Sequence, residues 1–127
     1  MEVNRRSEGW MLRCYTNESE GNHIHPYVEI VYLLEGTVDF SIEGSVSTMY
    51  AGDIIAVNSN RRHGWSFQEK SLLCTVWIDY EMLTEYLGQD ILLFWCNSTE
   101  EKNEYYQQLS LIMNDLLREF AADQVNS

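Results

Sequence analysis

Proline and basic residues are scarce in this sequence. Pro26 is the only proline among 127 residues, and 8 Lys and Arg stand against 20 Asp and Glu, which gives a formal net charge of -12 and a pI of about 4.4. Because a surface of this sign repels nucleic-acid phosphates, we expect no DNA binding by this chain alone. Hydrophobic residues make up 45% of the sequence, which predicts one globular domain with a sizeable core.

The sequence also lacks a signal peptide and any apolar run long enough to cross a membrane. Its three cysteines, Cys14, Cys74 and Cys96, are odd in number and widely spaced. Together these absences predict a reduced, cytoplasmic protein with no membrane partner. We interpret the cysteines as small core residues rather than as catalytic or redox-sensing thiols.

Short apolar or alternating runs, separated by turn residues, fill the first two thirds of the chain. Residues 37–43 alternate strictly between apolar and polar, and Gly44-Ser45 can close a two-residue hairpin to residues 46–50. Further strands are predicted at 10–15, 54–57, 63–67 and 72–78, with a short apolar segment at 91–95. With a single proline, this pattern predicts a mainly β fold, an antiparallel barrel or sandwich. Residues 1–9 are polar and are predicted to form a flexible arm.

The stretch from Gly21 to Gly36 carries most of the chemistry. In an extended strand that runs through Pro26, the odd-numbered His23, His25 and Glu29 project from one face. From Glu29 onward both faces are apolar, which predicts a strand buried on both sides. A carboxylate and two imidazoles are costly inside such a strand unless they are paired, hydrogen-bonded or bound to a metal.

This stretch resembles the first motif of the cupin superfamily, in which His-x-His is followed by a glutamate and then a glycine; here these are His23, His25, Glu29 and Gly36. The second cupin motif is similar at Gly52 and His63, whereas Asn58, Asn60 and Phe67 replace its proline, glycine and asparagine. The resemblance implies a jelly-roll β-barrel and a metal site formed by His23, His25, Glu29 and His63. Three imidazoles and one carboxylate suit one divalent transition metal: Fe, Mn, Ni, Co or Zn. The alternative is a metal-free pocket wall in which the histidines bond to one another, to Glu29 or to an effector.

The residues around these motifs are similar to the N-terminal sensor domain of AraC-type bacterial transcription regulators. The similarity lies in residues 23–36, 51–55, 58–63 and 94–98. It implies a cupin-like antiparallel β-barrel over residues 10–97, with a short helix near 79–87. The barrel would bind a small polar effector, a sugar or related metabolite, in a pocket lined by His23, His25, Glu29, His63, Trp65 and Trp77. In that family DNA is bound by a C-terminal module, which is absent here; residues 123–127 would begin the linker to it.

A long amphipathic helix is predicted over residues 98–122. Ser98 and Glu101 form a capping-box signature at its start, and apolar residues then recur every three or four positions. One edge of this wide stripe matches a coiled-coil seam that could join two copies into a homodimer. That edge consists of Tyr105, Leu109, Ile112 and Leu116. The alternative is that the whole stripe packs on its own domain.

Three functional hypotheses follow. The first is a ligand-sensing and dimerisation domain of an AraC-type regulator, which is not an enzyme. The second is a metal-dependent cupin enzyme, a dioxygenase or isomerase, that uses His23, His25, Glu29 and His63. The third is a dimerisation module whose pocket is vestigial. We favour the first.

Overall fold

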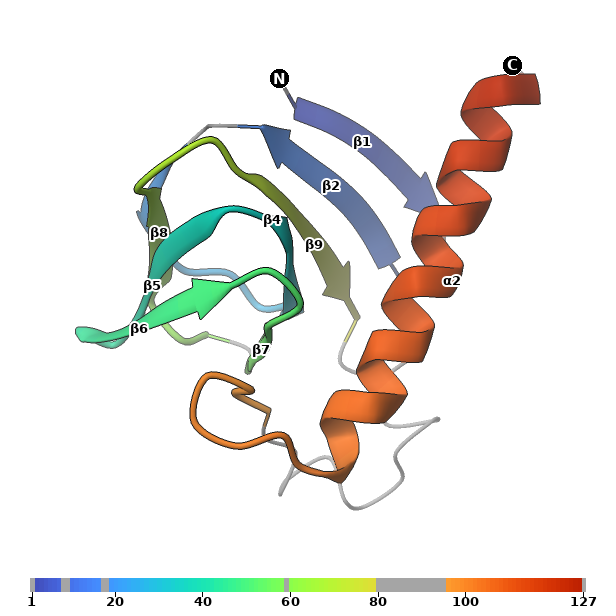
Figure 1. The fold of residues 1–127 in the computed structure, drawn as a ribbon. Helices are drawn as coiled ribbons and strands as arrows, with labels where there is room; N and C mark the ends of the chain where they lie inside the picture. Colours follow the sequence, from blue (N-terminus) through green and yellow to red (C-terminus); the bar gives the residue numbers. More distant parts are fainter. Residues whose placement is uncertain (1, 8–9, 17–18, 59, 80–95, 127) are drawn as a thin grey trace.

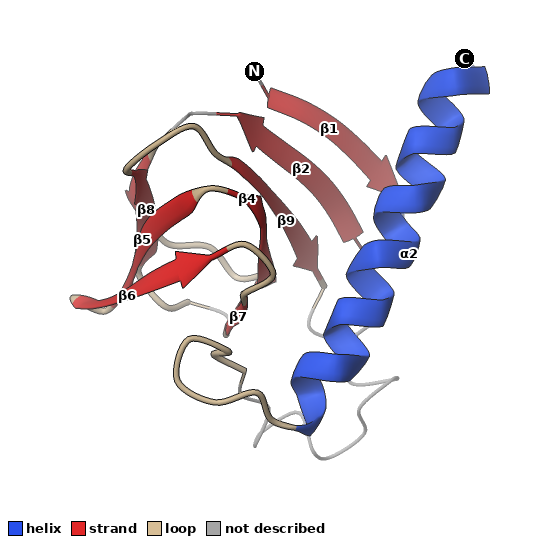
Figure 2. Cartoon of the chain, in the orientation of Figure 1, coloured by secondary structure: helices blue, strands red, loops and turns tan. Residues whose placement is uncertain are grey.

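The computed structural model describes residues 2–7, 10–16, 19–58, 60–79 and 96–126. Its strands form two antiparallel sheets (Figures 1 and 2). The five-stranded sheet has the order β1-β2-β9-β4-β7, with β1 at Glu2–Ser7, β2 at Trp10–Thr16, β9 at Leu72–Ile78, β4 at Val28–Glu35 and β7 at Ile54–Val57. The four-stranded sheet has the order β3-β8-β5-β6, with β3 at Glu20–His23, β8 at His63–Phe67, β5 at Thr37–Ile42 and β6 at Ser45–Tyr50.

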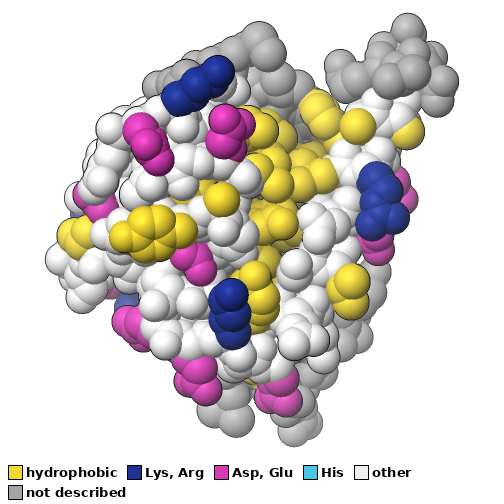
Figure 3. Space-filling view, in the orientation of Figure 1, with side chains coloured by type: hydrophobic (Ala, Val, Ile, Leu, Met, Phe, Trp, Pro, Cys, Tyr) yellow, Lys and Arg dark blue, Asp and Glu magenta, His cyan; other side chains and the backbone are white. Residues whose placement is uncertain are grey.

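The single helix of the described residues, α2 (Glu104–Asn126), lies against the outer face of the five-stranded sheet (Figure 1). The molecule therefore has three layers, and the five-stranded sheet is the middle one. Hydrophobic side chains gather along the boundary between the strands and α2 (Figure 3). This helix is too polar to span a membrane.

Alternation along β4 separates two hydrophobic cores, as the sequence predicted. Val31 and Leu33 face the four-stranded sheet and pack in a cluster with Phe40. Ile30 and Tyr32 face the other way, into a cluster with α2. Of the residues that α2 contributes to this second cluster, Leu109 and Met113 are the most deeply buried. Both faces of β4 are therefore buried, which explains its continuous apolar sequence.

The two sheets do not close into the barrel that we expected. Strands of the described residues pair only within their own sheet, and the chain crosses between sheets in loops. Residues 2–7, expected as a flexible arm, instead form β1, which pairs with β2 along its whole length. This pairing uses backbone groups, which a polar sequence supplies as well as an apolar one.

One of these crossings, the β4–β5 connection, depends on Gly36. Its φ is +91°, and a Cβ atom at this position would meet the Ser71 side chain and the Lys70 carbonyl and lie 2.8 Å from Ser71 Cα. The backbone of this turn therefore rests directly on the segment that precedes β9. Only glycine satisfies both conditions.

Two turn predictions were displaced. The β5–β6 hairpin turns at Glu43-Gly44, both with positive φ, rather than at Gly44-Ser45. The long helix begins at Glu104 because Asn103, not Ser98, caps it: Asn103 Oδ1 accepts the backbone N–H groups of Tyr105 and Tyr106 at 3.1 and 3.2 Å. The predicted helix near 79–87 and the segment 91–95 lie almost wholly outside the described residues.

Ser98 has a different role from the predicted cap. Its Oγ accepts the backbone N–H of Ile54 at 2.8 Å and donates to Asp53 at 2.7 Å. Cys96, two residues earlier, accepts the backbone N–H of Ala56 through its carbonyl. Residues 96–98 are therefore hydrogen-bonded to β7, and residues 99–103 connect them to the start of α2.

Candidate metal centre

Four side chains, three from strands and one from a connection, converge between the sheets. His23 ends β3 and His63 begins β8, and the two are paired across the four-stranded sheet. Glu29 lies in β4 of the other sheet, and His25 lies in the connection between β3 and β4. The single strand that we predicted through Pro26 is therefore wrong, because the chain changes sheets there. The crossing nevertheless brings together the four predicted residues.

The three histidines surround one oxygen of Glu29. The distances to Glu29 Oε1 are 3.0 Å from His25 Nε2, 3.3 Å from His63 Nε2 and 3.8 Å from His23 Nε2. One ligand atom from each of the four residues lies within 4.8 Å of the other three. The side chains of Glu29 and His63 are each 1% exposed, that of His25 is 9% and that of His23 is 24%. The cluster therefore opens to solvent beside His23.

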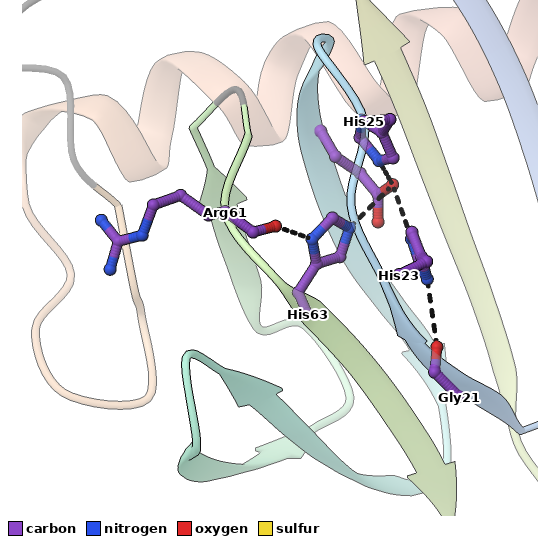
Figure 4. A network of polar contacts seen from close by, with 6 residues as sticks. Gly21, His23, His25, Arg61 and His63 are labelled. Atoms are coloured by element: carbon purple, nitrogen blue, oxygen red, sulfur yellow. Dashed lines mark hydrogen bonds and ion pairs between the residues drawn. The ribbon is translucent and has the colours of Figure 1, made fainter.

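Backbone carbonyls orient two of the rings. His23 Nδ1 lies 3.2 Å from the Gly21 carbonyl oxygen, and His63 Nδ1 lies 2.7 Å from that of Arg61 (Figure 4). A carbonyl oxygen can only accept, so each Nδ1 carries the proton and donates it. In the neutral rings, Nε2 then presents its lone pair to the centre of the cluster. This is the arrangement by which proteins prepare histidine for a metal.

The loop that precedes His63 is hydrogen-bonded to the connection between β3 and β4. The backbone N–H of Asn60 donates to the His25 carbonyl at 2.8 Å, and Asn60 has a φ of +62°. Asparagine tolerates this left-handed conformation better than other side chains do. Asn60 can therefore replace a motif glycine without loss of the turn.

Glu29 is ionised within this cluster. Burial acts to raise the pKa of Glu29, but its contacts with the rings of His23, His25 and His63 outweigh burial and hold the pKa below its ordinary value. Within the described residues, its second oxygen, Oε2, is buried with no hydrogen-bond partner, as is Nε2 of His63. Two buried polar atoms of the cluster are therefore left for a bound group, and His63 Nε2 is 3.3 Å from Glu29 Oε1.

A cation would give both of these atoms a partner, and the spacing fits one. Adjacent ligands of a transition metal with bonds of about 2.1 Å are about 3 Å apart. The Nε2–Oε1 distances of His25 and His63 agree with that value, and a small ring movement would bring His23 to it. The donor set of this site thus suits the metals named from the sequence.

Aromatic rings surround the cluster, and they include both predicted pocket tryptophans. The Trp77 ring is 4.2 Å from His25, and the Trp65 ring is 6.0 Å from His23. Tyr27 stacks on Trp77, and the Arg13 guanidinium lies 4.6 Å from the centre of the same ring. Sequence analysis missed Tyr27 and Arg13. An arginine inside the otherwise apolar run 10–15 was a usable signal for the second.

The sequence and the fold both match known proteins. Residues 11–79, a segment that contains all four cluster residues, match the family model of the cupin domain. The chain belongs to the cupin family. The glycines that its motifs retain, Gly36 and Gly52, both have positive φ, as Asn60 does.

Solved cupin structures share this fold. A cupin superfamily protein of Desulfitobacterium hafniense is 10% identical and has a TM-score of 0.59 over 62% of this chain and 76% of its own. An RmlC-like cupin of Shewanella frigidimarina is 17% identical, with a TM-score of 0.57 over 61% and 73%. KdgF of a Halomonas species is 19% identical, with a TM-score of 0.57 over 61% and 77%. No curated protein matches the sequence.

The predicted dimer residues of this cupin lie on α2, away from the metal cluster. Leu109 is buried against the five-stranded sheet, and Tyr105 and Leu116 are partly buried there. Ile112 is 48% exposed, and its neighbour Leu111 is exposed as well. Most of the predicted seam therefore packs on its own domain, and Ile112 is the member that faces solvent.

Proposed function

We propose that this cupin binds one divalent transition metal ion through His23, His25, Glu29 and His63, and that the site receives a small polar molecule such as a sugar. The observation that supports this most strongly is that two buried polar atoms of the cluster, Glu29 Oε2 and His63 Nε2, have no hydrogen-bond partner among the described residues. A bound metal would supply Lewis acidity and open coordination positions for a ligand oxygen.

The chain's own residues would hold the ligand at the exposed side of the cluster. The carbonyls of Gly21 and Arg61 keep His23 and His63 in place, so the site is prepared before binding. Tyr27, which is 38% exposed, offers a flat apolar surface to the C–H face of a sugar-like molecule. Because Glu29 is buried and ionised, it offsets part of the metal charge.

Metal content, measured by elemental mass spectrometry on tag-free protein, tests this proposal. We expect close to one transition metal ion per chain and its loss in the double variant His23→Ala, His63→Ala. Glu119→Gln, which removes an exposed carboxylate from α2, is the matched control and should keep the metal. Wild-type protein that remains metal-free after incubation with iron, nickel and zinc would overturn the proposal.

For the biological role we propose the ligand-sensing and dimerisation domain of an AraC-type regulator. The sequence resemblance described above supports it. A second support is chemical: the three histidines of the sequence are all in the cluster, so none remains to transfer protons once they bind a metal. A sensor must bind its effector more tightly in one state than in the other. We therefore expect sugar binding without turnover, together with a shift in the monomer–dimer equilibrium.

A metal-dependent enzyme, a dioxygenase or isomerase, is the second candidate. The exposure of His23 favours it, because a substrate could reach the metal from that side. Oxygen consumption and sugar isomerisation by metal-loaded protein distinguish the two roles. Turnover that disappears in the His23→Ala, His63→Ala variant would establish the enzyme and exclude a sensor without catalytic activity.

We propose that two copies meet through the exposed edge of α2 at Ile112. Ile112→Asp should shift the monomer–dimer equilibrium toward monomer in analytical ultracentrifugation, with little change in thermal stability, because the side chain is already 48% exposed. Gln107→Asp, at another exposed position of α2, is the matched control. An unchanged dimer in Ile112→Asp, or a monomeric wild type, would contradict this interface.

A further inference from the structure

Two cysteines are neighbours on the face of the five-stranded sheet that lies beneath α2. Cys14 of β2 and Cys74 of β9 are register partners, and their Sγ atoms are 2.8 Å apart. Both are free thiols. Their separation of sixty residues in the sequence concealed this proximity, which our interpretation of them as small core residues did not include.

The backbone already satisfies the geometry of a disulfide. Register partners in antiparallel strands have Cα atoms about 4.5–5.5 Å apart, inside the range of about 4.4–6.8 Å that a disulfide requires. An S–S bond is about 2.05 Å long, so the two sulfurs need to approach by less than about 1 Å. Side-chain rotation can supply this movement without a change in strand pairing.

The two thiols differ in environment. Cys14 is half-buried, whereas Cys74 is fully buried. The hydrogen bond with Cys74 lowers the pKa of Cys14, and the same contact together with burial raises the pKa of Cys74. Cys14 is therefore the more accessible sulfur and the one more readily ionised, which is the combination found in reactive cysteines.

We propose that Cys14 and Cys74 are a reversible redox site that a hydroperoxide converts to a disulfide. The Cys14 thiolate attacks the terminal peroxide oxygen, the O–O bond breaks, and the released alkoxide or hydroxide takes a proton. Cys14 is then a sulfenic acid. The Cys74 sulfur attacks the Cys14 sulfur, the S–O bond breaks, and the proton of Cys74 leaves with the hydroxide as water. Two thiols and one peroxide thus give one disulfide, one alcohol or water, and a further water.

The cross-link would join β2 to β9 directly under α2. Cys74 packs in the cluster that contains Leu109 and Met113 of the helix. It is also the register partner of Tyr32, whose hydroxyl donates to Asn114 of α2 at 3.3 Å. Oxidation would therefore make rigid the part of the sheet on which the helix rests.

Mass spectrometry of the full chain after brief treatment with hydrogen peroxide, in the presence of a chelator, tests the site. Remaining thiols are alkylated in denaturant. We expect a chain about 2 Da lighter that takes up one alkyl group on Cys96, and a linked peptide pair containing Cys14 and Cys74. Dithiothreitol should restore uptake at all three cysteines.

Variants assign the two roles. Cys96→Ser is the matched control and should still form the disulfide, whereas Cys14→Ser should not. Cys74→Ser should leave a sulfenic acid on Cys14 that dimedone traps. Three alkyl groups on oxidised wild-type protein, or a cross-link that contains Cys96, would overturn the proposal, and neither result depends on the folding of a variant.

Discussion

At the scale of single residues, Glu29 holds a negative charge where water hardly reaches it, because its side chain is 1% exposed. Three imidazoles compensate for the lost hydration, and they hold the pKa of Glu29 below its ordinary value despite burial. A buried charge of this kind is retained only with partners. Glu29 is also the only anionic member of the candidate metal site.

Glu29→Gln should therefore remove metal binding while it preserves the shape of the side chain. We expect affinity for zinc or nickel to fall by at least about 100-fold, because the charge of a direct ligand is lost. Competition with a chromogenic chelator measures this change. Glu119→Gln should leave the affinity unchanged. Equal affinities for wild type and Glu29→Gln would mean that Glu29 is not a ligand.

Cys96 provides a prediction about pH. Burial raises the pKa of its thiol to about 11 from an ordinary value of 9.0. The folded state therefore keeps the proton between these values, while the unfolded chain loses it. The contribution of Cys96 to the free energy of unfolding is fully present below about pH 9. It is lost as the pH rises toward 11, by up to about 3 kcal/mol. Denaturant unfolding at several pH values should show a steeper loss in wild type than in Cys96→Ala; parallel curves would contradict this.

At the scale of elements, the β4–β5 connection lies directly against the segment before β9, and Gly36 makes this close contact possible. Gly36 needs a positive φ and also leaves no room for a Cβ against Ser71. Gly44, in the β5–β6 hairpin, has a positive φ as well, but open space surrounds it. Substitution at Gly44 therefore measures the cost of backbone strain alone, whereas substitution at Gly36 adds the cost of a steric clash.

Gly44→Ala should lower the free energy of unfolding by about 1 kcal/mol through strain alone. Gly36→Ala should lower it by about 3 kcal/mol or more, because overpacking adds to the strain. Urea unfolding followed by circular dichroism measures both. Equal losses in the two variants would show that the contact with Ser71 relaxes without cost.

Several elements were predictable from the sequence because side-chain alternation reports which face of a strand is buried. The bounds of β7, β8 and β9 agree with those predicted, and the two faces of β4 were assigned correctly. The start of α2 was not predictable, because Ser98 and Asn103 are both good capping residues and only tertiary contacts choose between them.

The candidate site was predictable in composition but not in construction. His23, His25 and Glu29 share odd numbers, yet His25 lies in no strand and the other two lie in different sheets. Alternation cannot report which sheet a strand joins. The proximity of Cys14 and Cys74 was hidden for the same reason.

At the scale of the whole molecule, the candidate metal ligands come from two layers. His23 and His63 belong to the four-stranded sheet, and Glu29 belongs to the five-stranded sheet. These sheets share no strand pairing within the described residues. A bound ion would therefore stabilise their association directly.

Metal removal should lower the midpoint of thermal unfolding. With free metal at 100 times its dissociation constant, binding contributes about 2.7 kcal/mol, which corresponds to roughly 10 °C for a chain of this size. Differential scanning fluorimetry with and without a chelator checks this value. The His23→Ala, His63→Ala variant should show no response to the chelator, and a response there would place the metal elsewhere.

The alternation of β4 also bears on how such a protein can evolve. Its odd-numbered residues face the candidate metal site and the core between the sheets, and its even-numbered residues pack toward α2. A point substitution on one face of β4 can therefore change the contacts of that face without changing those of the other. Insertion or deletion of one codon within β4 would exchange the two faces, placing Glu29 beneath the helix. Descendants of this gene should thus accept apolar exchanges at the core positions of β4, Glu29 excepted, more readily than a change in its length.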